Sequence, residues 1–291
     1  MTFADSPRAR GETNSVSRRF DGVLSALGLA RRGFYIPFRG ASALPAPGSL
    51  PAYLPVANAL LCGEPAFQSH LAAIEQCAAA LESLGGEPPA PRWTQDWFPR
   101  LDAAAAYAMV LRHRPRRIVE VGSGHSTRFL ARAAADAACG TKIAAIDPAP
   151  RANLSGLAIE FIRDAVQNVG QTPFAALEPN DLLVIDSSHV LMPGTDVDHL
   201  INRILPLLPA GVRIHFHDMF LPRDYPRDWG WRGYNEQLAV AALIASRAYT
   251  VDFASAYIVA EHPEWVARGV LGRLPLPAGA RESSLWLTKL V

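Results

Sequence analysis

From about residue 93 onward, the chain alternates short apolar runs with longer stretches of helical character. The clearest run, residues 117–121, is rich in β-branched side chains and suits a buried parallel strand. Gly122 and Gly124 follow it, and glycine permits both a sharp turn and a close approach of the backbone to a ligand. Because a helical stretch begins at residue 128, this part of the chain is predicted to fold as strand, tight turn and helix.

Further apolar runs of the same kind are predicted as strands. They span residues 142–147, 159–165, 181–186, 212–218, 249–260 and 284–290. A helix at residues 102–111 is expected before the first strand, and helices at 197–208 and 239–247 separate later ones. This alternation indicates parallel pairing with right-handed crossovers. The predicted fold class is α/β, with a doubly wound, Rossmann-like sheet.

The part before residue 92 has a different character. Residues 1–19 are polar and charged, and their composition predicts a mobile tail. Residues 20–91 form a helical and irregular extension, with helices expected at 20–29 and 67–84. A proline-rich stretch between these helices, residues 45–55, is expected to break any regular element. The extension is interpreted as packing or as a homo-oligomer contact, with a lid as the alternative, and residues 92–291 are predicted to be the main domain.

The glycine turn fits two nucleotide chemistries. It can present helix N–H groups to a pyrophosphate, as in NAD binding, or hold the amino-acid end and ribose of S-adenosylmethionine. Thr127 stands where a dinucleotide site has its third glycine. Glu120, just before the turn, would repel a pyrophosphate but attract the ammonium group of methionine. Both residues favour S-adenosylmethionine.

Residues 120–127, Glu-Val-Gly-Ser-Gly-His-Ser-Thr, resemble the first motif of the class I S-adenosylmethionine-dependent methyltransferases, E/D-x-G-x-G-x-x-T. The resemblance covers about residues 93–291 and implies a seven-stranded sheet with an antiparallel edge. It places the cofactor on Glu120, Gly122, Ser123, Gly124 and Thr127. Asp147, at the end of the second strand, suits the ribose hydroxyls. Asp164, after the third strand, is the residue that the resemblance places at the adenine amino group.

Ligands of open α/β sheets bind beyond the carboxyl ends of the strands. This rule draws attention to Asp186 and His189 after the fourth strand, and to His217 and Asp218 after the fifth. His215 lies within the fifth strand and is interpreted as structural.

The same two strand ends resemble the metal site of catechol-type and antibiotic-sugar O-methyltransferases. In that group a carboxylate ends the fourth strand, two adjacent oxygen ligands end the fifth, and together they hold magnesium. Here Asp186, His217 and Asp218 occupy these positions. Magnesium prefers oxygen, so the histidine leaves open a softer divalent ion or no metal.

His189 is the candidate catalytic base, assisted by Asp186 and Asp218. Imidazole is suited to removing a hydroxyl proton while the oxygen attacks the sulfonium methyl group. Alternatively, His189 binds Asp186 and orders the loop. The segment 220–237, rich in aromatic and arginine residues, is expected either to line the methyl-acceptor pocket or to pack on the core.

The composition of the chain limits the binding partners that can be expected. A formal net charge of +1 gives no basic surface for nucleic acid or an anionic membrane. Three cysteines without a C-x-x-C spacing indicate neither disulfides nor zinc, and no apolar signal segment or membrane span is seen. A cytoplasmic protein that acts on a small-molecule methyl acceptor is therefore expected.

Two alternatives remain open at the level of sequence. The chain could be a non-catalytic module that keeps the S-adenosylmethionine fold for assembly, against which the acids and histidines at the strand ends argue. It could also be an NAD-dependent oxidoreductase. Thr127 and the absence of a Tyr-x-x-x-Lys pair disfavour that second alternative.

Overall fold

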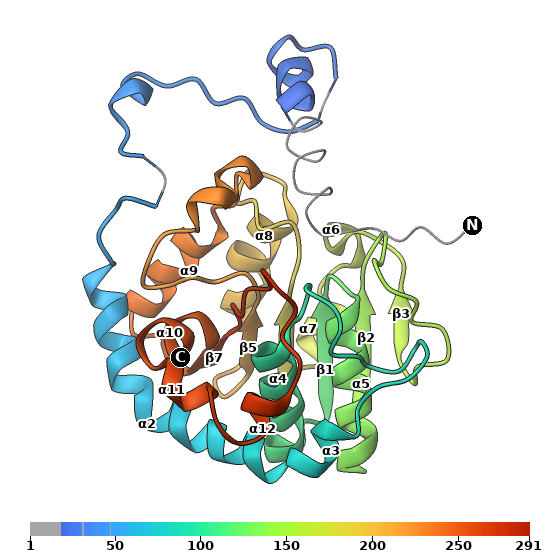
Figure 1. Ribbon diagram of the computed structural model, residues 1–291. Helices are drawn as coiled ribbons and strands as arrows, with labels where there is room; N and C mark the ends of the chain where they lie inside the picture. Colours follow the sequence, from blue (N-terminus) through green and yellow to red (C-terminus); the bar gives the residue numbers. More distant parts are fainter. Residues whose placement is uncertain (1–18, 31, 47) are drawn as a thin grey trace. The chain divides into compact units, whose positions relative to one another are not determined.

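The computed structural model describes residues 19–30, 32–46 and 48–291 (Figure 1). Two compact units divide the chain. One comprises residues 52–223 and 235–291, and the other combines the segment before residue 52 with residues 224–234. The tail predicted at residues 1–19 falls almost entirely outside the described residues.

The larger unit is built on a seven-stranded sheet in the order β3-β2-β1-β4-β5-β7-β6. Its strands are β1 (Arg117–Val121), β2 (Lys142–Ile146), β3 (Glu160–Ile162), β4 (Leu182–Ile185), β5 (Arg213–Phe216), β6 (Tyr249–Ala254) and β7 (Leu285–Lys289). The first five strands are parallel, and β7 runs antiparallel to both β5 and β6. The α/β class and an antiparallel strand near the β6 end of the sheet are confirmed. The antiparallel strand itself, β7, lies one position in from the edge.

Helices pack around this sheet (Figure 1). The longer ones are α2 (Leu54–Gln76), α4 (Arg100–His113), α5 (His125–Ala137) and α9 (Glu236–Ala245). Shorter ones are α3 (Ala78–Glu82), α6 (Val166–Val169), α7 (Thr172–Ala175), α8 (Asp196–His199), α10 (Ser255–Glu261), α11 (Pro263–Val266) and α12 (Gly269–Arg273). The π-helix η2 (Leu200–Ile204) and the 3-10 helix η3 (Leu205–Leu207) continue α8.

The N-terminal boundary differs from the prediction at residue 92. Helix α2 packs against β6, α4 and α9, so the larger unit already begins at residue 52. Pro55 lies in the first turn of α2, where its missing N–H has no helical partner to lose, and Pro65 lies inside the helix. The proline-rich sequence predicted a break in regular structure up to residue 55, but helix α2 begins at Leu54 and contains Pro55.

Two other elements differ from their predicted form. The strand expected at residues 249–260 ends at Ala254, and Tyr257 and Ile258 belong to helix α10. Apolar residues in a short run fit either period, so the pattern alone does not separate strand from helix. The helix expected at 197–208 changes to π and 3-10 geometry before Pro206.

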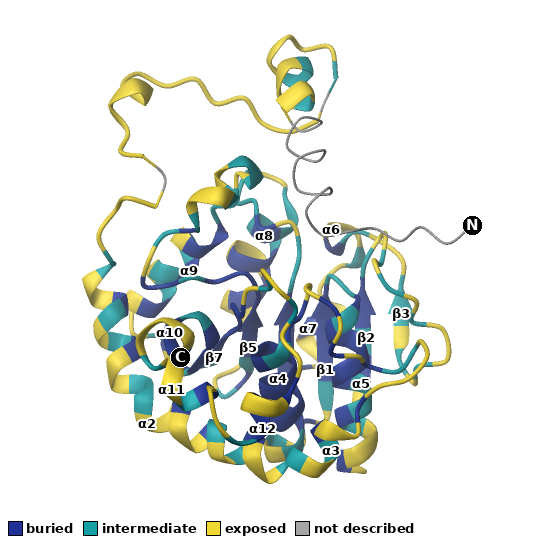
Figure 2. Ribbon diagram, viewed as in Figure 1, coloured by how far each residue is buried: buried dark blue, intermediate teal, exposed yellow. Residues whose placement is uncertain are grey.

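The core is centred on β1 and β4, whose apolar side chains are buried (Figure 2). Helix α4 is buried along residues 101–110, as Figure 2 also shows. The edge strand β3 has an exposed end and half-buried residues. None of the helices in the described part of the chain combines the length and apolar character that crossing a bilayer requires.

The smaller unit holds a helix at residues 19–26 and the 3-10 helices η1 (Ala41–Ala43) and η4 (Arg227–Arg232). Its two segments are joined by a hydrogen bond from the Gly48 N–H to the Asp224 carboxylate, 3.0 Å long. Within the second segment, the Arg232 guanidinium lies 4.0 Å from the centre of the Trp229 ring. The predicted role of this aromatic segment in an acceptor pocket stays a prediction.

Candidate functional site

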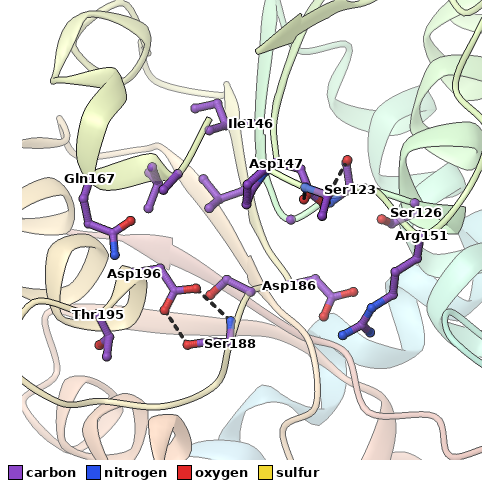
Figure 3. Close-up of a pocket in the computed structure, with 18 of the residues that line it drawn as sticks. Ser123, Ser126, Ile146, Asp147, Arg151, Gln167, Asp186, Ser188, Thr195 and Asp196 are labelled. Atoms are coloured by element: carbon purple, nitrogen blue, oxygen red, sulfur yellow. Dashed lines mark hydrogen bonds between the residues drawn. The ribbon is translucent and has the colours of Figure 1, made fainter. Parts of the chain in front are cut away.

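The turn between β1 and α5 forms one wall of a cavity of about 520 Å³ (Figure 3). Gly122 has a φ of 79°, a left-handed conformation that favours glycine. The Gly124 N–H donates to the Thr127 hydroxyl at 2.9 Å and so closes the start of α5. Gly122, Ser123 and Gly124 line the cavity, whereas Thr127 is buried beneath the turn.

Asp147 lies at the carboxyl end of β2 and also lines the cavity. Its carboxylate accepts hydrogen bonds from the Ser123 N–H at 2.7 Å and from the Ser123 hydroxyl at 3.1 Å. The Ala149 N–H donates to its other oxygen at 2.7 Å. These contacts fix a carboxylate at the position predicted for ribose binding.

Glu120 and Asp164 have different surroundings from those expected. Glu120 is fully buried and accepts a hydrogen bond of 2.6 Å from Ser126, and it is not among the residues that line the cavity. Burial raises the pKa of Glu120 to about 8, so the group is mostly uncharged at neutral pH. The Asp164 carboxylate accepts hydrogen bonds from the Ala165 N–H, just before α6, and from the side-chain amide of Asn168. Neither carboxylate lines the cavity, so the roles of Glu120 at the ammonium group and of Asp164 at the adenine amino group stay predictions.

Four predicted residues converge where β4 and β5 end. The His189 Nε2 atom lies 3.3 Å from Asp186 Oδ1 and 3.6 Å from Asp218 Oδ2. The His217 Nδ1 atom lies 3.4 Å from Asp218 Oδ1 and 3.6 Å from Asp186 Oδ1. Because β4 and β5 are parallel neighbours, their carboxyl ends bring these side chains together.

Two buried carboxylates outside the predicted site contact the second ring nitrogen of each histidine. The Glu236 carboxylate lies 2.9 Å from His189 Nδ1, and the Asp102 carboxylate lies 3.2 Å from His217 Nε2. Asp102 is in the first turn of α4, yet its oxygens accept from the backbone N–H groups of Ser283 and Ser284. We call these six residues the histidine–carboxylate cluster: Asp102, Asp186, His189, His217, Asp218 and Glu236.

The carboxylates of the cluster raise the pKa of both histidines. Burial alone would lower the pKa of His189, but hydrogen bonds to Asp186 and Glu236 and the charge of Asp218 raise it well above 6.5. Burial would also lower the pKa of His217, and the charges of Asp186 and Asp218, with the bond to Asp102, raise it well above 6.5. Both imidazoles therefore favour the charged form, whereas burial raises the pKa of Glu236.

The expected metal site at Asp186, His217 and Asp218 is not supported. Within residues 19–30, 32–46 and 48–291, no group of three or more His, Cys, Asp and Glu side chains is arranged to hold a metal ion. His217 Nε2 faces Asp102 and its Nδ1 faces Asp218, and in the charged form of the ring neither nitrogen offers a lone pair to a metal. In this protonation state, the donor set does not fit a metal.

His215, within β5, has the structural role expected of it. It is fully buried, and its Nε2 atom lies 2.8 Å from the Ser284 hydroxyl. Burial lowers the pKa of His215 to about 3, so the ring is neutral. Its ring packs 4.7 Å from that of Trp286 on β7.

A comparison of the sequence with known protein families covers the glycine turn and the strand ends of the cluster. Residues 119–219 match the sequence profile of a family described as "Methyltransferase domain". No curated protein matches the chain.

Several solved structures resemble the chain at low sequence identity. The SAH-bound Podospora anserina methyltransferase PaMTH1 is 15% identical, with a TM-score of 0.42, and the match covers 89% of this chain and 100% of that one. The O-methyltransferase from Bacillus cereus in complex with SAH is 19% identical, with a TM-score of 0.34, covering 63% and 82%. By sequence, residues 119–219 are thus a methyltransferase domain, and this segment lies in a seven-stranded sheet with an antiparallel β7.

Proposed function

We propose that this enzyme transfers the methyl group of S-adenosylmethionine to a hydroxyl oxygen of a small molecule. One observation carries the proposal: Asp186 lines the cavity beside the glycine turn and also contacts both histidines of the cluster. A cofactor site and a proton-transfer site thus meet at one side chain. A volume of about 520 Å³ lies within the range of small-molecule sites.

Methyl transfer requires that the acceptor oxygen be aligned with the methyl group and that one group accept the hydroxyl proton. The acceptor oxygen forms a bond to the methyl carbon while the carbon–sulfur bond breaks, and S-adenosylhomocysteine leaves as a neutral sulfide. The hydroxyl proton passes to His189 Nε2, which faces Asp186 and Asp218, in the molecules whose imidazole is neutral and has lost its proton at this nitrogen. Glu236 holds the other nitrogen, which fixes the orientation of the ring.

The rival functions give different expectations. A non-catalytic module would not need a buried histidine held by a carboxylate beside its cofactor cavity. An NAD-dependent enzyme would place a pyrophosphate at the α5 N-terminus, close to the carboxylate of Asp147. Mass spectrometry of the copurified ligand distinguishes S-adenosylmethionine from NAD directly.

Replacing Asp147 tests the cofactor site. Asp147→Ala should weaken S-adenosylmethionine binding by about 1 to 3 kcal/mol, because charge-assisted hydrogen bonds to the ribose are lost. Isothermal titration calorimetry measures this change. Unchanged affinity in Asp147→Ala would remove the residue from the site. Asp164→Ala is the companion variant: retained affinity would limit Asp164 to its local hydrogen bonds with Ala165 and Asn168.

Chelation tests metal assistance. Because the donor set does not fit a metal, methyl transfer should survive exhaustive treatment with EDTA and dialysis. The rate of S-adenosylhomocysteine release, before and after treatment, is the measurement. Activity that is lost with EDTA and restored by magnesium or manganese would contradict this and return Asp186 and Asp218 to the role of ligands.

A further inference from the structure

The wall of the cavity carries an uneven set of charges. Three carboxylates line it, those of Asp147, Asp186 and Asp196. Arg151 is the single lysine or arginine among the described residues that line it. His125 also lines the cavity, but burial and the charges of Arg128 and Arg92 lower its pKa to about 4. At neutral pH this imidazole is uncharged, and Arg151 is the fixed positive group of the wall.

The Arg151 guanidinium has an aromatic partner and no acidic one. Its central carbon lies 4.5 Å from the centre of the Trp97 ring, and Trp97 also lines the cavity. No ion pair joins Arg151 to a carboxylate of the described residues. Stacking on an aromatic face leaves the N–H edge of the guanidinium free to bind an anion.

Arg151 and Gln167 lie on opposite sides of Asp147 in Figure 3. Arg151 extends on the side of Ser126 and Asp186. If Asp147 binds the ribose, the adenine and methionine parts of the cofactor extend to these two sides. The methyl group must lie near Asp186, where the cluster begins, so the methionine part belongs on the side of Arg151.

We propose that Arg151 binds the carboxylate of the methionine moiety of S-adenosylmethionine, with Trp97 holding the guanidinium in place. This inference rests on the proposed function. The cofactor carries two positive groups, the sulfonium and the ammonium, and one negative group. The three carboxylates of the cavity wall suit the two positive groups of the cofactor, whereas the cofactor's own carboxylate needs a cation. A planar guanidinium matches a carboxylate with two parallel hydrogen bonds.

Decarboxylated S-adenosylmethionine is the probe, since it keeps every other group of the cofactor. We compare its affinity with that of S-adenosylmethionine by calorimetry in the wild-type protein and in Arg151→Met. Arg151→Met should bind S-adenosylmethionine about 10-fold more weakly. This loss is at the lower end of the range for hydrogen bonds between charged groups, because Arg151 is exposed to solvent. Its affinity for the decarboxylated cofactor should not change.

Arg163→Met is the matched control. Arg163 also stacks on an aromatic ring, 5.3 Å from the centre of Phe161, but it does not line the 520 Å³ cavity. This variant makes the same change in net charge and should leave both affinities as in the wild type. Trp97→Leu should lower only the affinity for S-adenosylmethionine, by about 3-fold.

Two results would overturn the inference. Equal losses for both ligands in Arg151→Met, or no loss for either, would show that the guanidinium does not contact the carboxylate. Wild-type protein that binds neither ligand would overturn the proposed function as well. Wild-type binding of S-adenosylmethionine with an unchanged preference in Arg151→Met overturns the inference on Arg151 alone.

Discussion

His189→Ala should lower the rate of methyl transfer by about 10² to 10⁴ fold, the usual contribution of a general base. The affinity for S-adenosylmethionine should change little, because His189 is not among the residues that line the cofactor cavity. The rate is followed as S-adenosylhomocysteine release with the best acceptor from a panel of small hydroxylated compounds. Calorimetry gives the affinity separately.

A second histidine–glutamate pair provides the control for this variant. His262 Nε2 lies 2.8 Å from a Glu64 carboxylate oxygen, and neither residue lines the cavity. His262→Ala therefore removes the same kind of contact away from the site and should keep the wild-type rate. Full activity in His189→Ala would reduce that histidine to ordering its loop and leave catalysis to alignment alone.

The pH dependence follows from the charge on His189. The raised pKa keeps the imidazole protonated at and below neutral pH, and a protonated ring cannot accept the hydroxyl proton. The wild-type rate should therefore rise with pH through a value above 6.5. Glu236→Gln removes one of the groups that raise this pKa, so the rise should move to lower pH while the maximal rate falls. An unmoved pH profile would show that another group titrates.

The strand ends are the part of the site that the sequence predicts well. Buried parallel strands have a recognisable apolar composition, and their carboxyl ends must share one edge of the sheet. Asp186 and Asp218 lie far apart in the chain, yet the pairing of β4 with β5 brings their carboxylates to the same histidines. The period and order of the strands suffice for this result.

The supporting carboxylates could not be predicted in this way. Asp102 occurs in an alanine-rich helix, where an acid early in the first turn indicates favourable helix charge. Its actual partners, His217 and the backbone of Ser283 and Ser284, come from segments more than a hundred positions away. Glu236 similarly begins α9, and only the folded chain shows that it meets His189.

The protonation states of His189 and His217 also could not be predicted from the sequence. A histidine beside an aspartate at a strand end resembles a metal ligand as much as a proton carrier. The distinction depends on what faces its second nitrogen, which is a buried carboxylate for both His189 and His217. The charge of the cluster is thus a property of packing.

Gly122→Ala should destabilise the protein by about 3 kcal/mol, combining a left-handed backbone strain with overpacking. Gly122 has a φ of 79°, and a Cβ added there would lie 1.8 Å from the carbonyl oxygen of Asp186. The clash is with backbone, which cannot rotate away, because the Asp186 N–H donates to Val121 at 2.9 Å and fixes the strand end. Urea denaturation measures the free energy of unfolding.

Gly140→Ala separates the two causes of that loss. Gly140 has a φ of 73°, close to that of Gly122, but no atom lies within 4 Å of an added Cβ. Its substitution should cost only the backbone strain, about 1 kcal/mol. Equal losses in the two variants would show that β1 and β4 yield to the extra methyl group. A larger loss in Gly122→Ala would show that the cofactor turn and Asp186 must meet in backbone contact, which is how the sheet joins the cofactor cavity to the histidine–carboxylate cluster.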